Sequence, residues 1–309
     1  MGKITSVFRK SATGVQSTTM EPNFALTSKG SGPLNGPLRS NKSVNPWTTR
    51  GVEKQSDVSV SEDKKPVFNS ALIDKNMICY LNPRSYEAEM FRILRENILF
   101  PFSGNPPRLI LITSVNPGEG KSFVASNLSI SIAQNMNSHV VLLDCDLRRP
   151  CIHSRFGYSD VPGLKEHLSR GRSIASLLLN TMVDKLTILP AGKLPTNPAE
   201  LITSKKMMAL LEEMKSRYTD RYIIMDAPPP NFSSETNAIA RVVDGIILVV
   251  KYGVTPREMI LNMVEKIEKN KFLGTVINWF DLRSTSQYGY GTYRKYYHSY
   301  KAQRSQKIK

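Results

Sequence analysis

Cysteine is scarce in this sequence and never occurs as a closely spaced pair. Cys79, Cys145 and Cys151 are the only three among 309 residues, and no Cys-x-x-Cys is present. An odd number of isolated cysteines argues against a disulfide framework, and the missing pair argues against a zinc site. This usage is typical of a protein from a reducing compartment, and we expect Cys145 to pack in the core.

Long apolar runs are missing as well. The longest are short segments such as Ile246–Val250, far below the ~20 residues that a membrane-spanning helix needs. Residues 1–10 are basic but contain no apolar stretch of signal-peptide length. We therefore expect a cytoplasmic protein that reaches a membrane only by docking on a partner.

Acidic residues are absent from the C-terminal end of the chain. Residues 283–309 carry seven Lys and Arg with no Asp or Glu, and residues 1–75 carry eleven against six. The two ends thus hold 12 of the 16 net positive charges, and such basic segments attract polyanions. Residues 1–75 are also rich in small polar residues and too poor in apolar clusters to offset their ordering entropy. The predicted organisation is a disordered arm over 1–75, one folded domain over 76–282 and a flexible basic tail over 283–309.

Between these ends, short apolar runs alternate with helical patterns. The predicted strands are Leu109–Thr113, Val140–Leu143, Leu186–Leu189, Tyr222–Met225, Ile246–Val250 and Leu273–Ile277. The predicted helices are Lys121–Gln134, Ala199–Arg217 and Pro256–Asn270. This alternation predicts an α/β fold, with a mostly parallel sheet and helices on both faces. In such folds ligands bind at the carboxyl ends of the strands.

A glycine-rich loop, Asn-Pro-Gly-Glu-Gly-Lys-Ser, joins the first of these strands to the first helix. Two glycines allow the tight turn that points backbone N–H groups at phosphate oxygens, and the helix start adds its positive dipole end. Lys121 would neutralise the β- and γ-phosphates and the Ser122 hydroxyl would bind Mg²⁺. Val115 stands where the usual phosphate loop has its first glycine, so this loop is a variant. The residues predicted to bind the nucleotide are Pro117, Gly118, Glu119, Gly120, Lys121, Ser122 and Phe123.

Three aspartates follow predicted strands at the same edge of the sheet. Asp144 and Asp146 come after the second strand, and Asp226 follows the fourth in the Walker B position. Mg²⁺ prefers oxygen ligands and keeps several waters, so one carboxylate bound directly and another through water would suit it. A remaining carboxylate can accept a hydroxyl proton.

With these motifs the chain resembles bacterial tyrosine autokinases (BY-kinases), the cytoplasmic kinases of capsule and exopolysaccharide export. The resemblance extends over roughly residues 85–300 and includes NPGEGKS, VVLLDCDLR and YIIMDAPPP as the three nucleotide motifs. The segment Leu194–Ile202 also resembles a signature of that family. The resemblance implies a P-loop NTPase fold of the MinD-like kind and ATP with Mg²⁺ as cofactors.

Two further features fit the resemblance. Glu89, Arg92 and Arg95 match the family's E-x-x-R-x-x-R oligomerisation motif and share one helix face, although such triplets are commonly solvated charges. The tail holds half of the chain's twelve tyrosines within thirteen residues. These six are Tyr288, Tyr290, Tyr293, Tyr296, Tyr297 and Tyr300. The resemblance implies that they are phosphorylated between subunits of a ring, and each phosphate would add about −1.5 to −2 charges.

The roles implied by the resemblance are as follows. Lys121 stabilises the transferring phosphoryl group, while Ser122, Asp144 and Asp226 organise Mg²⁺. Asp146 activates the tyrosine hydroxyl, with the division of labour between Asp146 and Asp144 left open. Asn278 contacts adenine. The implied partners are other copies of the chain in a ring, a separate transmembrane activator at the inner face of the plasma membrane, and a cognate tyrosine phosphatase.

Several alternatives have the same fold or a similar tail. A septum-site or chromosome-partition ATPase would carry a second lysine where this chain has Asn116, and an iron–sulfur carrier ATPase would need a Cys-x-x-Cys. A nucleotide-gated regulator with little kinase activity would assemble through Glu89 and leave the tyrosines incidental. An aromatic, basic tail could also stack on nucleic-acid bases, a reading that the ATPase motifs disfavour.

Overall fold

The computed structural model describes residues 5–7, 66–217 and 220–280, which all belong to one compact unit. The six candidate phosphoacceptor tyrosines lie outside the described residues, as does most of the predicted N-terminal arm. Among the described residues, no helix is long and apolar enough to span a bilayer.

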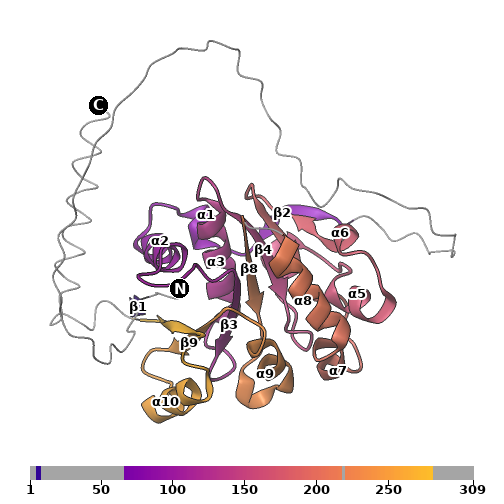
Figure 1. The fold of residues 1–309 in the computed structure, drawn as a ribbon. Coiled ribbons are helices and arrows are strands. Elements are labelled where there is room, and N and C mark those ends of the chain that lie inside the picture. The colour runs from indigo at the N-terminus through magenta and orange to yellow at the C-terminus, as the bar shows by residue number, and fades with distance from the viewer. Residues whose placement is uncertain (1–4, 8–65, 218–219, 281–309) are drawn as a thin grey trace, which may run out of the picture. The chain divides into compact units, whose positions relative to one another are not determined.

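The described strands form an eight-stranded sheet and a separate two-stranded sheet (Figure 1). The strands are β1 (Thr5–Val7), β2 (Phe68–Ile73), β3 (Leu109–Ser114), β4 (His139–Asp144), β5 (Phe156–Tyr158), β6 (Leu179–Asn180), β7 (Leu186–Leu189), β8 (Arg221–Asp226), β9 (Gly245–Lys251) and β10 (Phe272–Asn278). The large sheet has the order β1-β10-β9-β3-β8-β4-β7-β6, and β2 pairs with β5. All neighbours from β10 to β7 are parallel, whereas β1 and β6 at the edges are antiparallel. The predicted mostly parallel α/β sheet is confirmed.

Helices cover both faces of the large sheet (Figure 1). The helices are α1 (Ile78–Leu81), α2 (Tyr86–Leu99), α3 (Lys121–Ala133), α4 (Ile152–Arg155), α5 (Leu164–Arg170), α6 (Ile174–Leu177), α7 (Pro198–Ile202), α8 (Lys205–Arg217), α9 (Ser234–Ala240) and α10 (Arg257–Lys266), with a 3₁₀ turn at Pro230–Phe232. Successive residues of a strand point to opposite faces of its sheet, so alternate side chains of β9 pack against the helices on one face and on the other. Ile247 and Val249 belong to the cluster that includes α2 and α3, whereas Leu248 and Val250 pack with Met263 of α10.

Helix α3 lies deepest, and it carries the site. Every residue of α3 after Lys121 is buried, including its serines. A helix that is enclosed all round has little freedom to shift, so the phosphate loop that precedes α3 begins from a fixed point.

The structure corrects three predicted boundaries. The helix predicted over Ala199–Arg217 is broken into α7 and α8. The break has a local cause, because the Thr203 hydroxyl donates to the Ala199 carbonyl at 2.8 Å and the Ser204 hydroxyl accepts from Met207 N at 3.2 Å, as an N-cap does. The helix predicted over Pro256–Asn270 ends at Lys266.

The third correction concerns the predicted arm, which includes two strands. β1 pairs with β10 along the edge of the large sheet, and β2 pairs with β5. Both are short strands that form by pairing with a segment distant in the sequence. A local sequence pattern does not reveal such long-range pairing.

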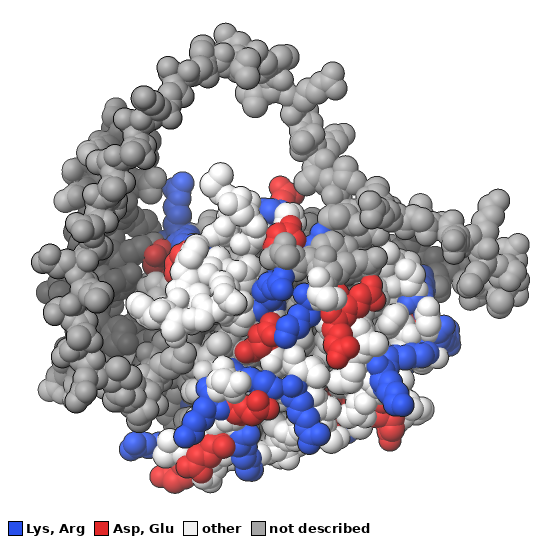
Figure 2. Space-filling view, viewed as in Figure 1, with Lys and Arg blue, Asp and Glu red and all other residues white. Residues whose placement is uncertain are grey.

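The described surface has mixed charge. The described residues carry 25 Lys and Arg and 20 Asp and Glu. In Figure 2 the basic and acidic side chains are interspersed over the visible face rather than gathered into patches of one sign. This face therefore offers no broad basic surface of the kind that tracks a nucleic-acid backbone.

Candidate functional site

The phosphate loop turns sharply at its two glycines. Gly118 has φ 81° and Gly120 has φ 93°, in the left-handed region that side chains with a Cβ adopt at a cost. At Gly120 space is limiting as well, since a Cβ there would lie 2.1 Å from Asn278 Nδ2. The loop therefore depends on glycine at this position for both conformation and close approach.

Glu119 holds the loop closed from inside. Its Oε2 accepts from Val115 N at 2.8 Å and from Asn116 N at 2.9 Å, and its Oε1 accepts from the Thr255 hydroxyl. The Glu119 side chain is buried, and it does not line the pocket described below. The predicted contact of Glu119 with the nucleotide stays a prediction, while its carboxylate braces the loop against the β9–α10 connection.

Val115 fits where the usual loop has glycine because it faces the core. It is fully buried in the cluster formed by Leu248, Val250 and Met263 under α10. In this variant loop the Val115 side chain packs in the core where the usual loop has a flexible glycine, and Glu119 holds the loop backbone by hydrogen bonds.

Asn278 joins the end of β10 to the loop. Its Nδ2 donates to the Glu119 carbonyl at 2.9 Å, and its Oδ1 accepts from Trp279 N at 2.9 Å. Asn278 lines the pocket, so its predicted contact with adenine stays a prediction. Part of its hydrogen-bonding capacity already serves to hold the loop.

Lys121 lies among carboxylates at the start of α3. Its Nζ is 3.0 Å from Asp146 Oδ2, 3.7 Å from Asp226 Oδ1 and 3.4 Å from the Ser122 hydroxyl. Burial favours the neutral amine, but the charges of Asp226 and Asp146 outweigh it and raise the pKa of Lys121. Lys121 is therefore a fixed cation.

The predicted aspartates come together as the strand order requires. Asp144 and Asp226 end neighbouring strands and are register partners, both fully buried. Asp144 accepts from Asp146 N at 3.2 Å and from Cys151 N and Ile152 N, both at 3.0 Å. Burial, with the nearby Asp226, raises the pKa of Asp144 to about 7, against the effect of these backbone donors.

Asp226 differs from Asp144 in the hydrogen bonding of its carboxylate. Within the part of the chain that the structure describes, neither of its buried carboxylate oxygens has a hydrogen-bond partner. Burial raises the pKa of Asp226, although the Lys121 amine opposes this. A buried carboxylate without a hydrogen bond is costly, and the Lys121 amine at 3.7 Å from Oδ1 offsets this cost only in part, so both oxygens are open to a bound cation.

These residues fit a magnesium ion bound mainly through water and phosphate. The Ser122 hydroxyl and the Asp226 carboxylate oxygens, which accept no hydrogen bond from the described residues, lie at the same edge of the sheet, beside Lys121. Within the described ranges no three His, Cys, Asp or Glu side chains form a ready metal cluster. Mg²⁺ does not need one, since it takes one or two carboxylates and completes its shell with waters and substrate phosphates.

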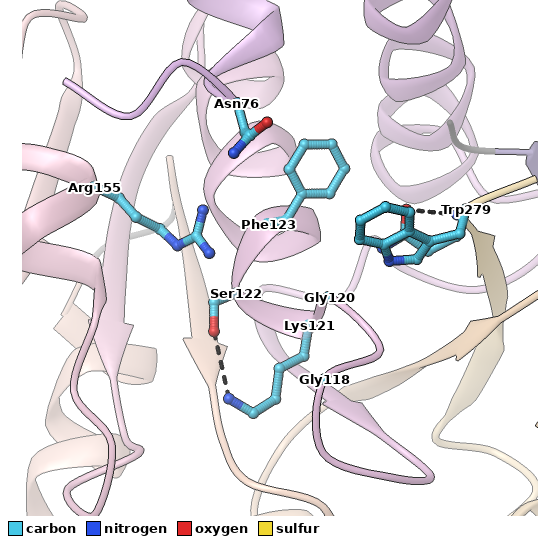
Figure 3. Close-up of a pocket in the computed structure, with 9 residues that line it drawn as sticks. Asn76, Gly118, Gly120, Lys121, Ser122, Phe123, Arg155 and Trp279 are labelled. Carbon is cyan, nitrogen blue, oxygen red and sulfur yellow. Dashed lines mark hydrogen bonds between the residues drawn. The ribbon is translucent and has the colours of Figure 1, made fainter. Parts of the chain in front are cut away.

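A pocket of 310 Å³ opens over the start of α3 (Figure 3). It is lined by Asn76, Gly118, Gly120, Lys121, Ser122, Phe123, Arg155, Asn278 and Trp279. Sequence reasoning had not singled out Asn76, Arg155 or Trp279. No motif marks them, because they come from the β2–α1 connection, the end of α4 and the residue after β10, which only the fold brings together.

Trp279, which lines the pocket, also has an uncommon backbone conformation. Its φ is 63°, an uncommon value for a bulky residue outside turns, and 45% of it is exposed at the pocket. The Lys251 amine lies 5.1 Å from the centre of its ring. A partly exposed aromatic ring in the pocket wall, on a backbone of uncommon conformation, is suited to stacking on a planar ligand.

The predicted oligomerisation residues lie on α2, away from the pocket. Glu89 and Arg92 form an ion pair, and Arg92 also donates to the Pro83 carbonyl. Arg95 donates to the Ser131 carbonyl at 3.1 Å and pairs with Glu96, so most of its side chain is covered. Glu89 and Arg92 remain about 30% exposed and available to another molecule.

Comparison with known proteins points to one family. Tyrosine-protein kinase YwqD of Bacillus subtilis (strain 168) is 34% identical over 220 residues, which are 71% of this chain and 92% of that protein. Tyrosine-protein kinase CpsD of Streptococcus agalactiae is 33% identical over 211 residues, 67% of this chain and 90% of CpsD. The kinase domain of Escherichia coli tyrosine kinase ETK superposes with a TM-score of 0.62 at 27% identity, over 69% of this chain and 83% of that domain. No protein-family model matches.

Proposed function

Because this chain belongs to the bacterial tyrosine-protein kinase family, we propose that it transfers the γ-phosphoryl group of Mg-ATP to tyrosine hydroxyls. The acceptors include the six tyrosines at 288–300, presented by another copy of the chain in an oligomer. The single observation that carries this proposal is the position of Lys121, held at the start of α3 between Asp146 and Asp226.

Binding of the nucleotide would exchange the partners of Lys121. In the structure its amine pairs with carboxylates, and the β- and γ-phosphates offer it a more highly charged partner at the same place. The N–H groups of the loop, held in position by Glu119, would point at the same oxygens. Mg²⁺ bound by Ser122 and Asp226, with Asp144 through water, would neutralise charge on the β- and γ-phosphates.

Moving Lys121 onto the phosphates would free Asp146 to act as the base. The tyrosine O–H proton passes to the Asp146 carboxylate, and the phenolic oxygen forms a bond to the γ-phosphorus. The bond between that phosphorus and the β,γ-bridging oxygen breaks, and ADP leaves. Asp144 suits the role of base less well, because three backbone N–H groups already occupy its oxygens.

We extend the proposal to the setting of the enzyme. Assembly through the face of α2 that carries Glu89 and Arg92 would bring one tail to the pocket of the next subunit. A membrane-bound activator would place this ring at the inner face of the plasma membrane, and the process controlled would be export of capsular or extracellular polysaccharide. A cognate tyrosine phosphatase would reset the tail.

A mixing experiment tests transfer between chains. A Lys121→Met chain with an intact tail receives Mg-ATP together with a chain in which all six tail tyrosines are Phe. Phosphotyrosine is then mapped by mass spectrometry, with the activator's cytoplasmic segment included. Phosphate on the tail of the Lys121→Met chain only when both are present supports the proposal. Hydrolysis of ATP by the mixture without phosphotyrosine contradicts it.

A further inference from the structure

Arg155 brings a second positive charge to the pocket. It is the last residue of α4, and no nucleotide motif of the sequence includes it. In Figure 3 its guanidinium points toward the start of α3, between Asn76 and the Ser122 hydroxyl and across the pocket from Trp279.

Asp74 holds Arg155 in this position. Asp74 Oδ2 pairs with Arg155 Nη1 at 2.5 Å, and Asp74 N donates to the Arg155 carbonyl at 3.0 Å. The other carboxylate oxygen accepts from Asn76 N at 2.8 Å and from Asn76 Nδ2 at 2.9 Å. One acidic residue thus fixes two residues of the pocket wall, and the side chain of Arg155 is ordered before any ligand arrives.

Arg155 has donors to spare. A guanidinium carries five N–H donors, and Nη1 is the only Arg155 nitrogen for which a carboxylate partner is present within the described residues. Its Nε is buried and has no hydrogen-bond partner among residues 66–217 and 220–280. A preorganised guanidinium with unused donors is well suited to planar, paired contacts with carboxylate or phosphate.

We propose that Arg155 is a further phosphate-binding residue of the site and contacts the phosphate groups of the nucleotide from the side opposite Trp279. Phosphate is the anion that fits, because Arg155 lines the same 310 Å³ pocket as Lys121 and Ser122. This inference rests on the proposed function, in that it assumes a nucleotide in this pocket. Arg155 then supplies a positive charge that the phosphate-loop motif alone does not contain.

The test measures binding of Mg-ADP and inorganic tripolyphosphate to the full chain by calorimetry. Arg155→Met removes the charge and keeps similar bulk, Arg155→Lys keeps the charge, and Asp74→Asn removes the ion pair but leaves the arginine. We expect Arg155→Met to weaken binding of both ligands by roughly 10- to 100-fold, the range of a charge-assisted hydrogen bond. Arg155→Lys should fall between Arg155→Met and wild type, and Asp74→Asn should weaken binding by less than Arg155→Met.

A double variant separates phosphate binding from a structural role. Arg155→Met leaves the Asp74 carboxylate without its ion-pair partner, which should destabilise the protein. Adding Asp74→Asn to Arg155→Met removes that unpaired charge and should restore stability. The inference stands if the double variant regains its melting temperature but still binds weakly, and it is wrong if binding returns with stability. Equal binding by wild type and Arg155→Met overturns this inference and leaves the proposed function intact. Failure of the wild type to bind Mg-ADP removes both.

Discussion

The Glu119 brace predicts a large and specific loss of stability on truncation. In Glu119→Ala the backbone N–H groups of Val115 and Asn116 lose their acceptor, and the Thr255 hydroxyl loses its partner across the β9–α10 connection. Leaving a buried donor unpaired costs about 1–3 kcal/mol. Because Val115 is fully buried and Asn116 only partly so, we expect the free energy of unfolding to fall by about 2–4 kcal/mol.

The assay is urea unfolding followed by circular dichroism, without nucleotide. A loss of this size corresponds to a melting temperature lower by roughly 4–16 °C in a domain of this length. Thr255→Val is the matched control, because it leaves the bonds from Val115 N and Asn116 N to Glu119 in place. It removes the bond from the Thr255 hydroxyl to Glu119 and the bond that this hydroxyl accepts from Lys251 N at 3.1 Å, and it should cost about 1–2 kcal/mol. A Glu119→Ala protein within about 0.5 kcal/mol of wild type would show that Glu119 does not brace the loop, because surface substitutions of no structural importance fall in that range.

Three other changes have clear expected outcomes. Gly120→Ala should abolish measurable Mg-ADP binding, because its Cβ would lie 2.1 Å from Asn278 Nδ2 and φ is 93°; retained affinity in calorimetry would contradict the loop geometry. Asp144 has a pKa of about 7 in the folded state against ~3.9 when unfolded. At a pH between these two values the carboxyl is protonated in the native state and ionised in the unfolded state. The stability of the nucleotide-free protein should therefore decrease as pH rises from about 4 to about 7, and Asp144→Asn should flatten this slope in urea titrations, which an unchanged slope would disprove. Glu89→Arg should change the melting temperature little, since the Glu89–Arg92 pair is partly exposed, yet should shift the protein to monomers in light scattering; unaltered oligomers would exclude this face of α2 from assembly.

Prediction from the sequence succeeded where a strong local signal coincided with burial. The strand at Leu109–Ser114 begins with four apolar residues and is buried throughout at the centre of the sheet, so its pattern left little choice, and the loop after it could be recognised from Gly118 to Ser122. The approach of Asp144 to Asp226 also followed, because carboxyl ends of parallel strands share one edge.

Other features depend on contacts between distant residues, which no local pattern encodes. The motif places Glu119 in the phosphate loop but does not reveal the hydrogen bond between its carboxylate and Thr255, which lies far along the chain. Arg155 is held at the pocket by Asp74, which lies in a segment predicted to be a disordered arm. The break between α7 and α8 was missed for a local reason, since Thr203 and Ser204 compete with the helix backbone through their hydroxyls.

An autophosphorylation assay on the purified full chain tests the proposed kinase activity. Wild type and Lys121→Met are incubated with Mg-ATP and the activator's cytoplasmic segment, and phosphotyrosine is mapped by mass spectrometry. We expect phosphate on tyrosines between 288 and 300 in the wild type and none in Lys121→Met, whose fold should be preserved in circular dichroism. Hydrolysis of ATP by the wild type without any phosphotyrosine would contradict the proposed kinase activity and leave an ATPase of the same fold.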